Sequence, residues 1–122
     1  MRVTGKRVLI ADDHPVLRGI MRSRLENQGF EVSEAANGAE AVHKAEEVKP
    51  DLVVLDLAMP VMNGLEAARI LKRLSPEVPL VMFTNNAGLI LEHEARSSGI
   101  SAVFSKSDGT DPLVTHVKGL LN

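Results

Sequence analysis

Short apolar runs alternate with helix-like stretches along the whole 122-residue chain, and this alternation constrains the fold more than any other feature. Runs of strand length occur at Val8–Ala11, Leu52–Leu55, Leu80–Phe83 and Ala102–Phe104, with a weakly alternating run at Glu31–Ala35. The third-strand run at 52–55 is the most apolar and is expected at the centre of a sheet, whereas 31–35 has the pattern of an edge strand. Strands joined by helices must pair in parallel, with right-handed crossovers.

Five stretches with helical periodicity separate or follow these strands. The first, Pro15–Gln28, opens with proline, which suits the first helical position. Asn37 and Asn63 each stand three residues before a glutamate, a capping-box pattern that marks the start of the second and third helices. The fourth helix, Leu89–Ser98, has loosely defined faces, and the fifth begins at Asp111.

Five βα units predict an α/β fold with a doubly wound parallel sheet of the flavodoxin-like type. In that architecture the strand order is 2-1-3-4-5, which places the first and third strands side by side. The chain contains no linker, repeat or low-complexity segment, so residues 1–122 are expected to form a single domain with no output domain in this chain.

Composition narrows the classes of function. A net charge of −2 and an aromatic content of 2%, all of it Phe, argue against direct nucleic acid binding. The absence of cysteine rules out disulfides and thiolate metal sites, and fits a reducing compartment. With no long apolar run and no signal peptide, no membrane segment and a cytoplasmic location are expected. His43, His93 and His116 share no ligand spacing and are expected at the surface.

Three carboxylates follow two of the predicted strands. Asp12 and Asp13 come directly after the first strand, and Asp56 comes directly after the third. Ligands of open parallel sheets bind at the carboxyl ends of the strands, where these acids converge. Carboxylates this close repel one another unless a cation lies among them. Because the acids are accompanied by no cysteine or clustered histidine, Mg²⁺ is the expected cation. His14 is expected at the start of the first helix, beside the acids and not bound to the metal.

Two further polar residues end the fourth and fifth strands. Thr84 follows the fourth strand and Lys106 closely follows the fifth, so both belong to the same sheet edge. A metal-binding acid pair, a carboxylate nucleophile, a hydroxyl and an ammonium are the groups needed to receive and hold a phosphoryl group. The spacing therefore favours phosphoryl transfer to an aspartate.

These motifs, taken together, resemble the receiver domain of two-component response regulators. The resemblance runs from about Lys6 to Leu121 and is carried by the acid pair, by the segment Leu55–Gly64, by Thr84 and by Ser105-Lys106. The segment Ala11–Arg18 looks most like receivers that precede helix-turn-helix output domains.

The resemblance implies a role for each site residue. Asp56 would be the phosphoacceptor. Asp13 and Asp56 would bind Mg²⁺ through their side chains, Asp12 mainly through water, and Ala58 through its backbone carbonyl. Lys106 would contact the phosphoryl group, and Thr84 would move toward it after transfer.

The resemblance also implies partners. The phosphodonor would be a phosphohistidine on a sensor histidine kinase or a histidine phosphotransfer protein. An output partner, or a second copy of the chain, would meet the face formed by the fourth helix, fifth strand and fifth helix.

The fifth strand departs from the family pattern. Val103 stands where the family usually has Tyr or Phe, and Phe104 is its neighbour, which should point to the opposite face of the sheet. We therefore hypothesise an altered coupling between Thr84 and this strand. Ser107 follows Lys106 where the family usually has proline, so a trans bond is expected there.

Two alternatives remain beside the phosphorylated signalling module, which itself would not be an enzyme acting on a separate substrate. One is an interaction module that is never phosphorylated, toward which Val103 and Ser107 lean. The other is a Mg²⁺-dependent phosphohydrolase with an aspartyl-phosphate intermediate, which would typically need an acid at position 58, where this chain has Ala58.

Overall fold

Five parallel strands form one sheet in the computed structural model, which describes residues 5–89 and 92–122. The strands are β1 (Arg7–Ala11), β2 (Glu31–Ala35), β3 (Leu52–Leu55), β4 (Leu80–Thr84) and β5 (Ile100–Ser105). Their order is β2-β1-β3-β4-β5, so the predicted fold class and strand order are confirmed. The central strands β3 and β4 are fully buried, as their apolar runs predict.

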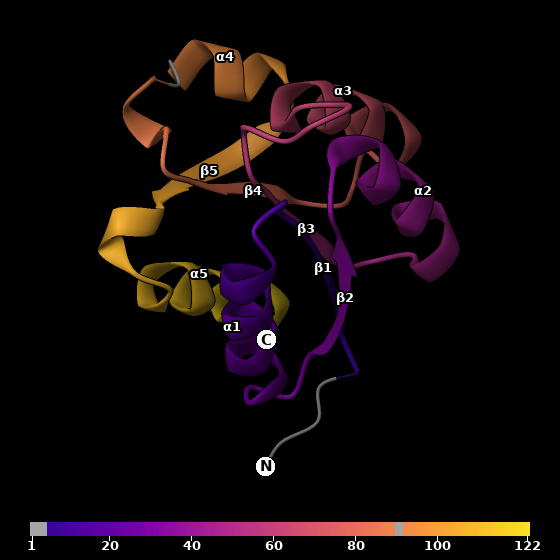
Figure 1. Cartoon of the computed structure of the whole chain (residues 1–122). Helices are drawn as coiled ribbons and strands as arrows, with labels where there is room; N and C mark the ends of the chain where they lie inside the picture. The colour runs from indigo at the N-terminus through magenta and orange to yellow at the C-terminus, as the bar shows by residue number, and fades with distance from the viewer. Residues whose placement is uncertain (1–4, 90–91) are drawn as a thin grey trace.

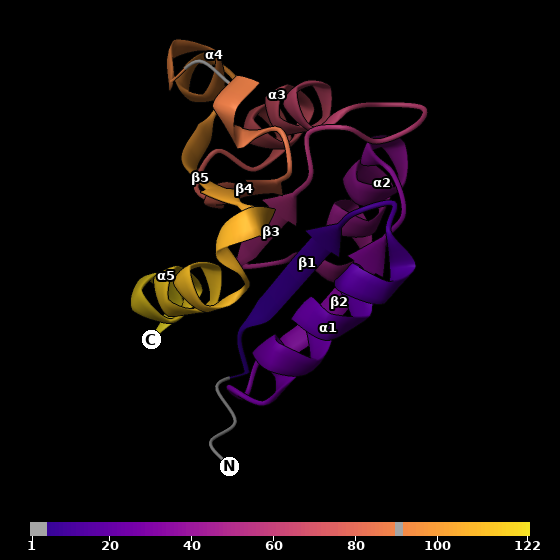
Figure 2. The same ribbon diagram turned by 60° about the vertical axis from the view of Figure 1, so that its left-hand side comes forward.

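Helices cover both faces of the sheet (Figures 1 and 2). One face carries α1 (Pro15–Glu26) and α5 (Asp111–Leu121), and the other carries α2 (Gly38–Val48), α3 (Gly64–Leu74) and α4 (Glu92–Ser97). Each layer has its own core of mostly aliphatic side chains packed against the strands. None of the described helices has both the length and the apolar character needed to span a bilayer.

The two asparagine caps differ in detail. At α3, the Asn63 side chain accepts from the Glu66 backbone N–H while the Glu66 side chain accepts from the Asn63 N–H, which completes the predicted capping box. At α2, Asn37 accepts from the Glu40 N–H at 2.8 Å, which is the one half of the box that forms. Both helices begin at the predicted position.

The region after β4 differs most from expectation. Of the helix predicted over 89–98, Leu89 belongs to a 3₁₀ turn, η1 (Ala87–Leu89), and residues 92–97 form α4; Ile90 and Leu91 lie outside the described residues. The prediction is confirmed over 92–97, and the loosely defined apolar faces of this stretch explain why its ends differ at Leu89 and Ser98. The fifth strand is longer than predicted, and a register shift opposite Leu80 leaves Ser101 as an extra residue.

His116 is a correction to the expected surface histidines. It lies half-buried on α5, with its ring centroid 5.2 Å from that of Phe104. The α5 stripe explains this, because position 116 lies three residues after the buried Leu113 and therefore on the same face of the helix. His43 and His93 are exposed, as predicted.

Candidate metal and phosphoryl site

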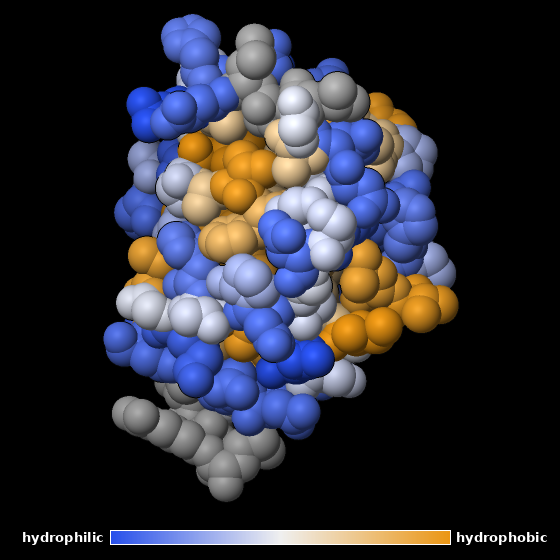
Figure 3. Space-filling view, turned by 90° about the vertical axis from the view of Figure 1, so that its left-hand side faces the viewer, coloured by the Kyte–Doolittle hydropathy of each residue, from blue (hydrophilic) through white to orange (hydrophobic). Residues whose placement is uncertain are grey.

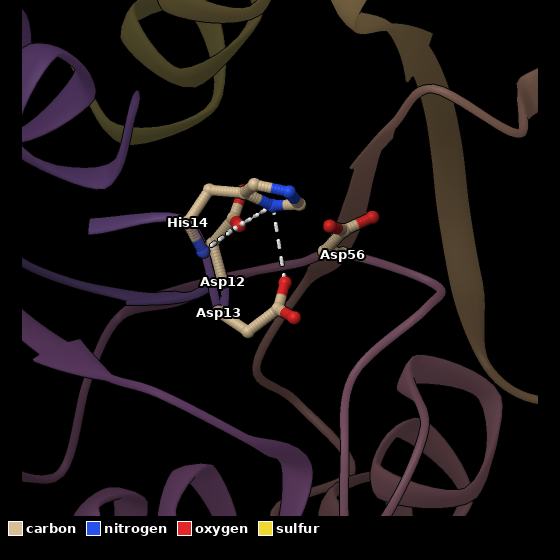
Figure 4. A group of neighbouring side chains, drawn as sticks. All are labelled: Asp12, Asp13, His14 and Asp56. Carbon is tan, nitrogen blue, oxygen red and sulfur yellow. Dashed lines mark hydrogen bonds and ion pairs between the residues drawn. The ribbon is translucent and has the colours of Figure 1, made fainter. Parts of the chain in front are cut away.

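The acids of β1 and β3 meet at the carboxyl edge of the sheet (Figure 4). Ala11 pairs with Leu55, so the residues that follow each strand are neighbours. The Asp56 N–H donates to the Ala11 carbonyl at 3.0 Å, and the Asp12 N–H donates to the Ala35 carbonyl at 3.0 Å. Backbone pairing therefore continues past the strand ends and fixes where both acids stand.

Lys106 bridges the two buried carboxylates. Its Nζ lies 2.8 Å from Asp12 Oδ2 and 2.9 Å from Asp56 Oδ2, and all three side chains are at most 5% exposed. Burial lowers the pKa of Lys106, but its hydrogen bonds to Asp12 and Asp56 and their negative charges more than offset this, so the pKa is raised above 10.5. The lysine is therefore a fixed positive charge between the two acids.

Asp56 has a free oxygen in spite of its burial. Its side chain is 4% exposed, and Oδ1 has no hydrogen-bond partner among the described residues. Asp12 Oδ2, by contrast, has the Lys106 ammonium as its partner at 2.8 Å. Leaving a buried carboxylate oxygen without a partner costs free energy. Asp56 Oδ1 is therefore suited to a cation or a phosphoryl group.

Asp13 and His14 form the outer side of the cluster (Figure 4). His14 Nδ1 lies 3.1 Å from Asp13 Oδ1 and 3.2 Å from Asp12 Oδ1. Ligand atoms of Asp12, Asp13, His14 and Asp56 all lie within 4.8 Å of one another. Carboxylate oxygens from three residues suit a hard divalent cation such as Mg²⁺. His14 is the N-cap residue of α1, where the sequence placed it.

Thr84 is fully buried at the end of β4, opposite Ser105 of β5. Its Oγ1 accepts a hydrogen bond from the Asn86 N–H at 3.1 Å, so the hydroxyl stabilises the turn that follows the strand. Ala58 lies exposed in the loop after β3. No interaction of either residue with the acids is among the contacts of the described chain.

Val103 and Phe104 point to opposite faces of the sheet, as strand alternation predicts. Val103 packs against the core under α2, α3 and α4, while Phe104 packs against the core under α1 and α5. Phe104 therefore does not take the place of an aromatic residue at position 103. The bond between Lys106 and Ser107 is trans, as expected, since the described residues contain no cis peptide.

Two backbone contacts that support the site, made by Gly64 and Arg18, could not be read from the sequence. A Cβ on Gly64 would overlap the Asp56 carbonyl oxygen, so glycine is required where α3 begins beside the acid. Arg18 Nη1 donates to the Asp12 carbonyl at 2.6 Å. The available signal for Arg18 was a charged residue beside the apolar stripe of the first helix, opposite the inward-facing Glu34 of β2.

The fold and its acidic edge together define a doubly wound α/β domain with a carboxylate cluster suited to a metal ion. Residues 8–118 match the model of the response regulator receiver domain, and the chain belongs to that family. The chain is 42% identical over 79 residues to the chemotaxis protein CheY of Thermotoga maritima, which covers 64% of this chain and 66% of that protein. It is also 34% identical over 113 residues to the sensor protein EvgS of Escherichia coli K12, covering 93% of this chain and 9% of EvgS.

Solved structures agree with the family. A CheY-like receiver domain protein from Methanospirillum hungatei superimposes with a TM-score of 0.89 at 29% identity, covering 96% of this chain and 94% of the other. The response regulator TrrA of Thermotoga maritima, solved in complex with Mg²⁺ and BeF, gives a TM-score of 0.87 at 31% identity, covering 95% and 99%. The chain thus spans the solved domains almost fully, but from 9% to 66% of the length of the first curated relatives.

Proposed function

We propose that the chain is a single receiver domain that accepts a phosphoryl group on Asp56 from a phosphohistidine donor. The observation that carries the proposal is the Asp56 carboxylate itself, which is buried at the end of β3, with Oδ1 unpartnered among the described residues and Oδ2 held by Lys106. A carboxylate in this position is a nucleophile with one oxygen free to attack.

The transfer needs no reactant besides the phosphohistidine donor. An Asp56 oxygen forms a bond to phosphorus, the phosphorus–nitrogen bond of the donor breaks, and the imidazole leaves with the electron pair and takes up a proton. The product is a mixed anhydride on Asp56. The Lys106 ammonium, already within 2.9 Å of Asp56, neutralises charge on the transferred oxygens. Thr84, at the end of the neighbouring strand, would donate its hydroxyl to one of them after giving up its turn contact.

A Mg²⁺ ion would be held by the side chains of Asp13 and Asp56, by Asp12 mainly through water, and by the Ala58 carbonyl. The ligand atoms of Asp12, Asp13 and Asp56, which lie within 4.8 Å of one another, support this assignment. When bound, the ion would stabilise the negative charge on the phosphoryl group during transfer. TrrA, a structural relative, was solved with Mg²⁺ and BeF, which adds support.

The donor would be a sensor histidine kinase or a histidine phosphotransfer protein. The match of this chain to part of a protein named as a sensor supports this class of partner. An output partner, or a second copy in a homodimer, would meet the face formed by α4, β5 and α5. There β5 is only partly buried over most of its length, and hydrophobic surface lies among hydrophilic residues (Figure 3). This domain is not expected to bind nucleic acid directly, because its net charge is −2.

Sustained hydrolysis of a separate substrate is not expected. Ala58 provides no acid two residues after Asp56 to protonate a leaving group. The phosphorylated aspartate would decay slowly, by attack of water at the same site.

Intact mass after incubation with a small-molecule phosphodonor and Mg²⁺ tests the proposal. One added phosphoryl group is expected on the wild-type protein and none on Asp56→Asn or in the presence of a chelator. An undiminished mass increase in Asp56→Asn would contradict the assignment of Asp56. No increase in the folded, metal-bound wild type would favour a module that signals without phosphate.

A further inference from the structure

We propose that Arg18 and Glu34 form a clamp that positions the acid pair Asp12-Asp13 for a divalent cation. Arg18 would thus be a positioning residue of the metal site, although it does not contact the cation itself. The inference rests on the metal role proposed above for Asp13.

The clamp is a single guanidinium with two partners. Arg18 Nη1 donates to the Asp12 carbonyl at 2.6 Å, and Arg18 Nε donates to Glu34 Oε1 at 2.7 Å. Both side chains are largely buried between α1 and the sheet, at 18% exposed for Arg18 and 24% for Glu34. Charge-assisted hydrogen bonds of this kind are about twice as strong as neutral ones. Arg18 therefore joins the turn after β1 to the strand beside it.

Glu34 is a firm anchor because both its oxygens are engaged. Its Oε2 accepts from Arg22 Nη1 at 2.8 Å, one helical turn beyond Arg18. The hydrogen bond from Arg22 lowers the pKa of Glu34; burial opposes this, and the bond from Arg18 lowers it further, so the net direction is down. The carboxylate stays charged. Its backbone pairs with Ile10 of β1, which fixes the anchor against the strand that carries the acids.

The Asp12 carbonyl matters because it belongs to the planar peptide group that joins Asp12 to Asp13. The Asp12 N–H is held by Ala35 of β2 at 3.0 Å, so Arg18 supplies the second fixed point of this residue's backbone. Asp13 has little else to orient it. Its side chain is 34% exposed, and within residues 5–89 and 92–122 its one polar side-chain contact is the imidazole of His14. The direction of the Asp13 carboxylate therefore follows from the peptide plane that Arg18 holds.

The charge of Arg18 and its positioning of Asp13 predict opposite changes in Mg²⁺ affinity when Arg18 is replaced by a neutral residue. Arg18 carries a positive charge close to the acids, and like charges repel. If only its charge mattered, a neutral replacement would tighten Mg²⁺ binding. If Arg18 positions Asp13, the same replacement weakens binding, because the ligand set is no longer held in place. Loss of residues that orient metal ligands typically lowers affinity about 10-fold to 100-fold.

The test compares Arg18→Met with Arg22→Met by calorimetric titration of the metal-free protein with Mg²⁺. Calorimetry is suitable because the chain has no Trp or Tyr to report binding by fluorescence. Arg22→Met is a matched control: it removes the same charge from the same helix and the same glutamate, but Arg22 does not contact Asp12. We expect about 10-fold weaker binding in Arg18→Met and a change within about two-fold in Arg22→Met.

Binding by Arg18→Met that equals or exceeds that of the wild type, or that falls no more than that of Arg22→Met, would overturn the clamp. If the wild type itself takes up no Mg²⁺, the proposed metal role fails and the clamp with it. If the wild type binds and Arg18→Met binds equally well, the clamp alone fails.

A second variant and a second readout distinguish weaker Mg²⁺ binding from loss of folding. Arg18→Lys keeps the charge and the aliphatic stem, but one ammonium cannot reproduce the fork that spans Asp12 and Glu34. Several-fold weaker binding is expected, and unchanged affinity would overturn the clamp. In either variant, raising the Mg²⁺ concentration should restore the rate of phosphorylation by a small-molecule donor, because the defect lies in metal binding. A rate that stays low at saturating Mg²⁺ would contradict a positioning role.

Discussion

Lys106 is the residue on which the metal-free site most depends. Its ammonium is the shared partner of two carboxylates that are each less than 5% exposed. Removing one partner of a buried ionic cluster leaves uncompensated charge and is strongly destabilising.

Substitution Lys106→Met should therefore lower the free energy of unfolding by about 3 kcal/mol without metal. Saturating Mg²⁺ should recover part of this loss, because the cation would replace the missing positive charge. Urea unfolding followed by circular dichroism, with and without Mg²⁺, measures both effects. Equal destabilisation in the two conditions would show that the cation does not bind at these acids.

Gly64 cannot carry a side chain without strain, because the backbone of Asp56 occupies the space that the side chain would need. Gly64→Ala should destabilise the protein by about 1–3 kcal/mol through overpacking and slow phosphorylation of Asp56. Gly19→Ala is the control, because a Cβ there meets nothing within 4 Å and helix propensity favours alanine by up to about 1 kcal/mol. Thermal unfolding and the phosphorylation assay should separate Gly64→Ala from Gly19→Ala. Similar behaviour of the two variants would contradict the close approach of Gly64 to the Asp56 backbone.

At the scale of elements, the contact between α1 and β2 links the stability of the domain to pH. The pKa of Glu34 is lowered from 4.5, chiefly by the hydrogen bond from Arg22. A lowered pKa means that the folded state favours the charged carboxylate. The stability that Glu34 contributes is thus fully present above its unfolded pKa and is lost as the pH falls through its folded pKa.

Glu34→Gln should accordingly destabilise the protein near neutral pH, and the difference from wild type should shrink as the pH falls below about 4.5. Urea unfolding at a series of pH values gives this difference. Glu31→Gln on the same strand is the control, because Glu31 is exposed and its ion pair with Arg7 spans 3.5 Å. A Glu34→Gln difference that stays constant down to strongly acidic pH would rule out this linkage.

The elements also show what the sequence could and could not predict. The apolar runs at Leu52–Leu55 and Leu80–Phe83 predict buried central strands because parallel strands are covered on both faces. The Asn63 box predicts the start of α3, since its partners are local. The region around α4 was predicted less well, because its six residues bury only Ala95 and no stripe defines its ends.

The residues of the site also divide into those that the sequence could group and those that it could not. Asp12, Asp13, Asp56 and Lys106 could be grouped from topology alone, because all follow strands at one edge of the sheet. Arg18 and Gly64 could not, since their roles depend on contacts with backbone atoms of Asp12 and Asp56. Such contacts leave no periodic pattern in the sequence.

At the scale of the whole molecule, the two core layers predict an uneven distribution of stability. The helices α1, α3 and α5 each bury at least two apolar side chains, whereas α4 is short and buries one. Amides of α4 should therefore exchange fastest among the described helices, because few buried contacts must be broken to open it. Hydrogen exchange by mass spectrometry measures this, and protection of α4 equal to that of α3 would contradict it.

Asp56, and no other acid of the cluster, is proposed to receive the phosphoryl group. The most direct measurement is borohydride reduction of the phosphorylated protein followed by peptide mass spectrometry, because reduction converts an acyl phosphate of aspartate into homoserine. The proposed function predicts homoserine at position 56 alone, formed only when Mg²⁺ and phosphodonor are both present. Homoserine at position 12 or 13, or its formation in Asp56→Asn, would contradict it.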